Sequence, residues 1–232
     1  EQLVPSVPVT VRINPLWMAA VKDLDACVIP GVDAVHLAQC EGADHVRVID
    51  GLITDLEVER SLPTGAIKLI AMIESADALT KVTKIARASP RLVGLTLGVE
   101  DYATSMGVSA TADLLRPAVY QLNQAAHAAN IHSFAVPTSM ADFKDLAVLE
   151  SQARYARKIG SVGGYAVHPA QVECLNVIFS PTTEELSWAQ AVVAAADKAQ
   201  KQGQGVFKVE GQMIDQPLIA RARTLLGMSG AV

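Results

Sequence analysis

The most informative run is Ile67-Lys68-Leu69-Ile70-Ala71-Met72-Ile73, which closes on Glu74. A second run, Leu92-Val93-Gly94-Leu95-Thr96-Leu97-Gly98, is followed in the same way by Glu100 and Asp101. Short, nearly continuous apolar runs of this kind are typical of strands buried on both faces of a parallel sheet. Acids at the carboxyl ends of such strands indicate a functional site, because α/β barrels place their chemistry at that end.

Outward from these runs, short β-branched segments alternate with longer helical stretches, which predicts successive βα units. Four further strands are expected, at 9–14, 34–38, 131–136 and 164–168. Apolar spacing predicts amphipathic outer helices over 44–60 and 141–159. Thr182 and Glu185 form a capping box, which predicts an alanine-rich helix that ends near Gly203. From the pattern alone, six units fit either an eight-stranded barrel short of two strands or an open six-stranded sheet.

Composition narrows the class of protein. The chain has 232 residues, half of them hydrophobic, which is enough for one domain with a sizeable core. The net charge of -5 and the scattered basic residues argue against a nucleic-acid partner. No apolar stretch reaches the roughly 18 residues of a membrane span, and no signal-peptide pattern is present. Cys27, Cys40 and Cys174 show no metal-ligand or disulfide spacing, so a reducing cytoplasm is expected.

Two further charged residues can be interpreted from their type and position. Arg12 interrupts the apolar strand 9–14, so its guanidinium needs an anion, either from a substrate or from a permanent acidic partner in the protein. Asp215, before Pro217, would ordinarily be a helix N-cap. Likewise, each strand-end acid taken singly could be a cap or a solvated loop residue.

Several ordered segments resemble one family. They are Val11-Arg12-Ile13-Asn14, Ile73-Glu74-Ser75-Ala76, Gly98-Val99-Glu100-Asp101-Tyr102, His168-Pro169-Ala170-Gln171-Val172, Phe179-Ser180-Pro181 and Gly211-Gln212-Met213-Ile214-Asp215-Gln216-Pro217. The chain resembles the citrate lyase β-subunit-like proteins of the HpcH/HpaI aldolase/citrate lyase family, which are close to malyl-CoA and citramalyl-CoA lyases. The resemblance implies a TIM (β/α)8 barrel over 1–181 whose first two strands would lie before Glu1, and a C-terminal helix and lid segment over 182–232.

The resemblance also implies an activity, namely a Mg²⁺-dependent carbon–carbon lyase. It would cleave a 3-hydroxyacyl thioester of the citramalyl-CoA, malyl-CoA or citryl type to acetyl-CoA, or an acetyl thioester, and a keto acid. Glu74 and Asp101 would hold the metal, Arg12 would bind the substrate and act in catalysis, and Asp215 from a neighbouring subunit would transfer a proton. A homo-oligomer, most simply a trimer, follows from that shared site. Glu100 is adjacent to Asp101 and should point away from it on an extended backbone, so we interpret it as a supporting or structural acid.

The sequence departs from the family pattern in ways that leave rival functions open. The family usually has a lysine where Tyr165 stands and another near Gln39, and these cations would grip the phosphates of CoA. One rival is a 2-keto-acid aldolase of the same superfamily. The other is a non-catalytic subunit, or one that needs an acyl-carrier protein. The histidines at 36, 45, 127 and 132 have no ligand spacing and are expected to be structural.

Overall fold

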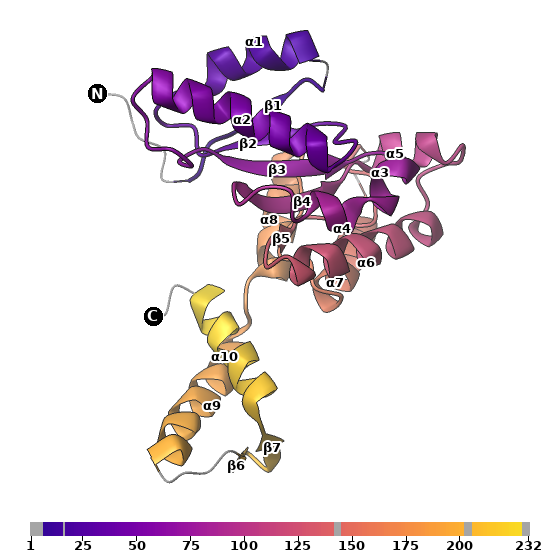
Figure 1. Cartoon of the computed structure of the whole chain (residues 1–232). Helices are drawn as coiled ribbons and strands as arrows, with labels where there is room; N and C mark the ends of the chain where they lie inside the picture. The colour runs from indigo at the N-terminus through magenta and orange to yellow at the C-terminus, as the bar shows by residue number, and fades with distance from the viewer. Residues whose placement is uncertain (1–6, 16, 142–144, 202–205, 229–232) are drawn as a thin grey trace. The chain divides into compact units, whose positions relative to one another are not determined.

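The computed structural model describes residues 7–15, 17–141, 145–201 and 206–228 (Figure 1). The chain divides into two compact units, Glu1–Leu175 and Asn176–Val232. Within the described ranges, each helix is too short or too polar to cross a membrane.

The first unit is built on a parallel sheet of five strands in the order β1-β2-β3-β4-β5. The strands are β1 (Thr10–Ile13), β2 (Ala34–Leu37), β3 (Lys68–Ile73), β4 (Leu92–Leu97) and β5 (His132–Ser133). Every strand pairs with the next one along the chain, as in βα units wound in one direction. The sheet confirms the predicted α/β class and leaves closure into a barrel as a prediction.

Eight helices follow or separate these strands in the described residues. They are α1 (Trp17–Cys27), α2 (Ala43–Glu59), α3 (Ala76–Thr80), α4 (Val82–Ile85), α5 (Val99–Ser105), α6 (Ala112–Ala128), α7 (Leu146–Lys158) and α8 (Pro169–Phe179). α1 packs on β1 and α2, α4 packs on α2 and α6, and α6 packs on β4 and β5. Helices α1 to α6 bury one face of the sheet in a continuous apolar core.

Side chains alternate along the strands, so the two faces of the sheet differ in polarity. Ile13, Leu37 and Ile73 are at most 1 % exposed and belong to the core beneath the helices. Their neighbours in sequence point to the opposite face, because successive strand residues alternate. In register across that opposite face, Arg12 pairs with His36. The polar residues of the strands are therefore gathered on the face away from the helices.

The prediction of a sixth strand over 164–168 is wrong. Val162 N–H donates to the Ser133 carbonyl at 2.9 Å, so the chain does run beside β5. No strand is formed at 164–168, however. A Cβ on Gly164 would lie 2.7 Å from Val136 Cγ2, so the backbone approaches its neighbour as only glycine allows. Glycine in such a run weakens strand formation, and the prediction gave too much weight to the β-branched residues around it.

The predicted ends of the other helices and strands agree with the structure to different degrees. α2 confirms the helix expected over 44–60 to within a residue at each end. α7 begins at Leu146 instead of 141, because Asp145 caps it by accepting a hydrogen bond from Val148 N–H at 3.1 Å. Residues 142–144 of the expected helix lie outside the described ranges. β5 covers only His132–Ser133 of the strand expected over 131–136.

The second unit contains α9 (Thr183–Lys201), β6 (Phe207–Val209), β7 (Gln212–Ile214) and α10 (Gln216–Met228). The capping box is confirmed: Thr182 N–H donates to Glu185 Oε2 at 2.9 Å and Glu185 N–H donates to Thr182 Oγ1 at 3.2 Å. The end expected near Gly203 lies outside the described residues. The antiparallel β6–β7 hairpin was not predicted from the sequence, and its turn residues Glu210 and Gly211 have φ of 50° and 84°.

Candidate functional site

A cleft of about 300 Å³ opens at the carboxyl ends of β2, β3 and β4. Glu74 follows β3 directly, and Asp101 lies in the first turn of α5 instead of at the end of the strand itself. Both acids line this cleft, together with Gln39, Cys40, Glu41, Ser75, Thr104 and Ser105. The fold thus brings together two acids that are separated by more than twenty residues in the sequence.

The carboxylate of Glu74 is buried and held in place by backbone. Glu74 is 8 % exposed, and its Oε2 accepts a hydrogen bond from Gln39 N–H at 2.9 Å. Gln39 has φ of 44°, a left-handed conformation that few residues other than glycine adopt. The next residue, Cys40, ties this turn to β3 by donating its N–H to the Met72 carbonyl at 3.0 Å. The turn after β2 therefore orients the acid after β3.

Glu74 is also in an electrostatic setting that a cation would improve. Burial raises the pKa of Glu74, and the nearby charge of Asp101 raises it further. The Gln39 N–H and the charge of Arg12 act in the opposite direction on that pKa. A positive ion bound beside Glu74 would offset both effects that raise its pKa and would favour its ionised form.

Gly98 makes room for this carboxylate. A Cβ at residue 98 would lie 2.5 Å from Glu74 Cγ and 2.6 Å from Glu74 Oε1. Such contacts are far inside van der Waals distance, so any larger residue would push the acid out of its position. Gly98 N–H donates to the Ile73 carbonyl at 2.9 Å, which holds the two strand ends together. The sequence run ending in Gly98 gave no indication of this close approach.

The donor set fits a hard divalent cation. In the described ranges, no three or more His, Cys, Asp and Glu side chains converge on a metal position, so the protein offers two carboxylates there. Mg²⁺ is commonly bound by one or two carboxylates, with water and substrate oxygens completing the shell. Burial raises the pKa of Cys40 to about 12, so the thiol in this cleft stays protonated at neutral pH. A soft, thiolate-bound metal does not suit this cleft.

Arg12 differs from expectation in its exposure. It sits on β1 between partly buried Val11 and buried Ile13, but its own side chain is exposed on the face away from the helices. No salt bridge to Arg12 is present among the described residues. The permanent internal ion pair that the sequence left open is therefore absent from this part of the chain. The charge of Arg12 lowers the pKa of both Glu74 and His36, so the guanidinium lies near these two residues.

A hydrogen-bonded chain that sequence reasoning missed crosses the same face. The Tyr165 hydroxyl lies 2.8 Å from His36 Nδ1, and His36 Nε2 lies 2.9 Å from Thr10 Oγ1. Burial lowers the pKa of His36, as does the charge of Arg12, and burial raises the pKa of Tyr165. The two rings are therefore neutral near pH 7. The sequence offered no signal for this chain, because the register that places His36 opposite Arg12 is set by strand pairing.

Asp215 lies in the second unit, directly before α10. It is exposed, its Oδ1 accepts a hydrogen bond from Leu218 N–H at 3.4 Å, and its carbonyl accepts one from Ile219 N–H at 3.1 Å. It is thus an N-cap, as its position before Pro217 predicts. Its part in a site shared between subunits stays a prediction.

Comparison with known proteins places the chain in a family. Residues 3–169 match the family model described as HpcH/HpaI aldolase/citrate lyase. The chain belongs to the HpcH/HpaI aldolase/citrate lyase family. This family assignment confirms the resemblance found in the sequence motifs.

Individual members of the family give the degree of likeness. The citrate lyase subunit beta of Leuconostoc mesenteroides subsp. cremoris is 33 % identical over 228 residues, covering 97 % of this chain and 75 % of that protein. An L-malyl-CoA/beta-methylmalyl-CoA lyase of Cereibacter sphaeroides is 29 % identical over 238 residues, covering 94 % of this chain and 74 % of that protein. A solved structure of CitE from Mycobacterium tuberculosis, in complex with magnesium, acetoacetate and coenzyme A, is 29 % identical, with a TM-score of 0.69 over 95 % of this chain and 78 % of that one.

Proposed function

We propose that this protein is a Mg²⁺-dependent carbon–carbon lyase that cleaves a 3-hydroxyacyl thioester into an acetyl thioester and a keto acid. The observation that carries the proposal is the pairing of Glu74 and Asp101 in one cleft at the carboxyl ends of the strands. Its relatives support the reaction class, since they are named as citrate lyase and malyl-CoA lyase proteins. The solved relative that contains magnesium, a small acid and coenzyme A supports the metal and the thioester.

Each residue has a defined task in this reaction. Glu74 and Asp101 would hold Mg²⁺, which when bound supplies Lewis-acid stabilisation of the negative charge that develops on the departing enolate. Arg12, exposed and without an acidic partner among the described residues, would hold the carboxylate of the substrate. The β-hydroxyl of the substrate passes its proton to a carboxylate base, and its carbon becomes the carbonyl of the keto acid as the carbon–carbon bond breaks. The electron pair of that bond passes to the thioester fragment, and the same carboxylate returns the proton to it.

Asp215 of a neighbouring subunit would carry out that proton transfer. Support comes from the family motif around it and from its exposed carboxylate at the start of α10. In this proposal the segment 182–232 is a lid that completes the site of another protomer. The active form is then a homo-oligomer, with a trimer as the simplest closed arrangement.

The acyl group favoured here is citramalyl-CoA or malyl-CoA. A second candidate is a citryl-type thioester on an acyl-carrier protein. One observation favours it: the position where the family usually has a lysine holds Tyr165, whose hydroxyl is engaged by His36, so no cation at that position is available for a CoA phosphate.

The proposal is tested by turnover of a panel of 3-hydroxyacyl-CoA thioesters, with Mg²⁺ and with a chelator, and with Asp101→Ala as control. Chelator-sensitive release of acetyl-CoA that disappears in Asp101→Ala is the expected result. No turnover from the folded protein, with or without an acyl-carrier protein bearing the same acyl groups, would contradict the proposal. Turnover of 2-keto-acid aldol substrates, unaffected by CoA compounds, would replace it with the aldolase.

A further inference from the structure

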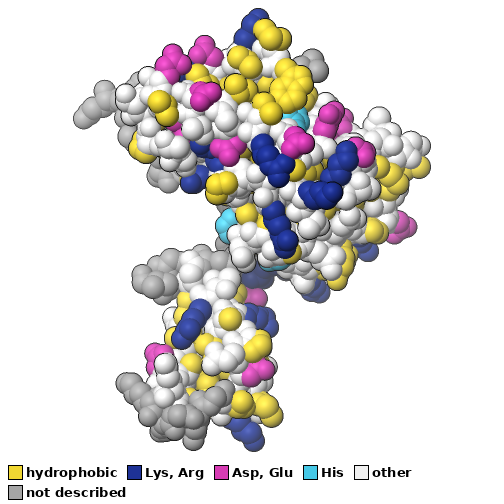
Figure 2. All heavy atoms as spheres, in the orientation of Figure 1, with side chains coloured by type: hydrophobic (Ala, Val, Ile, Leu, Met, Phe, Trp, Pro, Cys, Tyr) yellow, Lys and Arg dark blue, Asp and Glu magenta, His cyan; other side chains and the backbone are white. Residues whose placement is uncertain are grey.

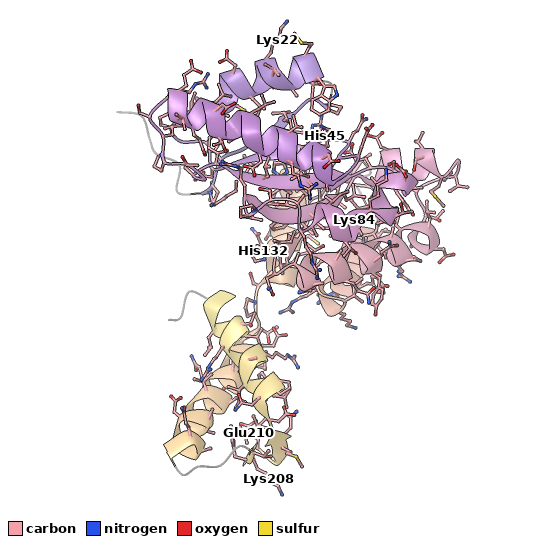
Figure 3. All side chains as sticks on the ribbon, in the orientation of Figure 1. Lys22, His45, Lys84, His132, Lys208 and Glu210 are labelled. Atoms are coloured by element: carbon pink, nitrogen blue, oxygen red, sulfur yellow. The ribbon has the colours of Figure 1, made fainter. Side chains whose placement is uncertain are left out.

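A second, larger cleft of about 910 Å³ lies outside the two carboxylates, between the N-terminal end of α2 and the α3–α4 segment. We call it the α2 cleft. Its wall includes Gln39, Gly42, His45, Arg47, Lys81 and Lys84. Figure 2 shows Lys and Arg side chains gathered on this face of the first unit, and Figure 3 labels His45 and Lys84. Nothing in the proposed lyase reaction uses these cations.

The imidazole of His45 has a donor without an acceptor. His45 is 9 % exposed, and Glu41 N–H donates to its Nδ1 at 3.5 Å. A neutral ring that accepts at Nδ1 carries its proton on Nε2. Nε2 is buried and has no hydrogen-bond partner among the described residues. A buried N–H of this kind costs free energy until an acceptor reaches it, so the site calls for a hydrogen-bond acceptor.

The N-terminus of α2 supplies further donors at the same place. The helix is 17 residues long, and its N-cap, Gly42, has no side chain to accept from the first-turn N–H groups. The aligned peptide dipoles of such a helix place about half a positive charge at its start. Together with His45, which is in the first turn, this end of α2 is suited to an anion.

The charged side chains leave a positive balance. The wall contains four cations, Arg47, Lys81, Lys84 and Arg87, and three acids, Glu41, Asp44 and Asp77. Two of the acids are paired within their own segments, Asp44 with Arg47 at 2.6 Å and Asp77 with Lys81 at 2.5 Å. Lys84 has no acidic partner among the described residues and is exposed. Lys84, the start of α2 and His45 therefore line one cleft whose charge favours a ligand with anionic oxygens.

We infer that the α2 cleft binds the phosphate group of a small molecule, as a phosphate monoester or a diphosphate. A phosphoryl group offers several diverging acceptor oxygens to donors that point in from different elements, whereas a carboxylate offers two. The volume exceeds that of a phosphate, so the remainder of the ligand also lies in the cleft. Trp17, 54 % exposed and with its ring centroid 5.1 Å from that of His45, offers an apolar surface beside it.

This inference does not rest on the proposed lyase reaction. Gln39 and Glu41 line both clefts, so a ligand in the α2 cleft would be adjacent to the metal site. The phosphate could belong to a substrate thioester or to a separate small molecule. The recognition chemistry is the same in both cases.

The test is a titration of the full chain with inorganic phosphate and with pyrophosphate in the presence of a chelator. Trp17 fluorescence is read in a Trp188→Phe background, which leaves one of the two tryptophans, and the Nε2 resonance of His45 is read by nitrogen-15 NMR. Saturable binding that moves both signals is expected. It should persist in Asp101→Asn, which separates this site from the metal site even if the lyase proposal fails.

Matched variants make the result specific. Lys84→Gln should weaken pyrophosphate binding about tenfold by removing a charge-assisted contact. Lys22→Gln removes the same charge from the exposed face of α1, away from the α2 cleft (Figure 3), and should leave binding unchanged. His45→Phe should abolish it. Binding that is absent, or equally weakened by Lys22→Gln and Lys84→Gln, would overturn the inference. If CoA displaces pyrophosphate, the phosphate group belongs to a thioester. If CoA does not displace it, the phosphate group belongs to a separate small molecule.

Discussion

At the scale of single residues, the candidate metal site depends on one missing side chain. Gly98→Ala places a methyl group 2.5 Å from Glu74 Cγ. We expect Mg²⁺ affinity to fall about 10- to 100-fold, as when a residue that supports a metal ligand is lost. Isothermal titration calorimetry with Mg²⁺ measures this directly.

The control for that substitution is Gly51→Ala. Gly51 lies within α2 and a Cβ there would meet nothing within 4 Å, so the same change should leave metal binding intact. It should also stabilise the protein by about 1 kcal/mol, because alanine favours helix over glycine. Equal Mg²⁺ affinity in Gly98→Ala and the parent protein would show that Glu74 is not a ligand or can move without cost.

Asp215 separates structural from catalytic roles at a single position. Asparagine caps helices as well as aspartate does, so Asp215→Asn should keep α10 intact while removing the acid. Asp215→Ala should in addition cost about 1 kcal/mol of stability. We expect turnover to be lost in both variants and thermal stability to fall only in the second. Full activity in a folded Asp215→Asn protein would leave this residue as a helix cap alone.

At the scale of secondary-structure elements, one buried ion-pair network joins α2 to the amino ends of the sheet strands. Arg91, 4 % exposed, donates to Glu57, 0 % exposed, at 2.8 Å and to Asp50 at 2.7 Å. It also donates to the Ile67 carbonyl at 2.7 Å. Residues at this end of a βα sheet stabilise the fold, whereas the chemistry takes place at the opposite, carboxyl end of the strands.

We expect Arg91→Met to cost about 3–5 kcal/mol of unfolding free energy, since it leaves a buried carboxylate unpaired. Urea denaturation at pH 7 measures the loss. Arg154→Met, which breaks an exposed helix pair with Glu150, is the matched control and should change stability by about 0.5 kcal/mol or less. Adding Glu57→Gln to Arg91→Met should recover part of the loss, and a loss in Arg91→Met no greater than in Arg154→Met would contradict this account.

The same network predicts a direction for the pH dependence. Burial alone would raise the pKa of Glu57, but hydrogen bonds from Arg91 and from two backbone N–H groups outweigh it and lower that pKa from its ordinary value of 4.5. The pKa of Asp50 is also lowered, with hydrogen bonds from Arg91 and Ser89 again opposing burial. The folded state therefore binds these protons less tightly than the unfolded state, and the stability is present above about pH 4.5 and lost as the pH falls below it. Urea midpoints between pH 7 and pH 3 should fall steeply in the parent protein and less in Arg91→Met.

At the scale of the whole molecule, the shared site can be tested by complementation. Asp101→Asn and Asp215→Asn should each be inactive, but co-expressed they should form mixed oligomers. Random assembly would pair an intact Asp101 with a neighbour's intact Asp215 at about one site in four, giving about a quarter of the parent activity. Inactivity of the mixture, with mixed oligomers shown by mass spectrometry, would place Asp215 and Asp101 in the same subunit's site or outside the site.

Much of the organisation could be predicted from local sequence. Local patterns of a few residues predicted an acid after β3 at Glu74, an acid shortly after β4 at Asp101, helix α2 and the capping box of Thr182 and Glu185. Such patterns survive folding because propensity, alternation and capping are short-range effects. The family motifs were visible for the same reason, since they are contiguous in the chain.

Tertiary structure alone determined what those residues meet. Three contacts join segments between 24 and 129 residues apart. They are the Gln39 N–H that orients Glu74, the close approach of Glu74 to Gly98, and the hydrogen bond between Tyr165 and His36. A backbone N–H has no residue-type signature, and a close approach is a property of two segments at once. Arg12 was expected to be buried because its neighbours are apolar, yet strand alternation leaves it exposed on the face that it shares with His36. Pairing across a sheet, which local sequence does not encode, made the difference.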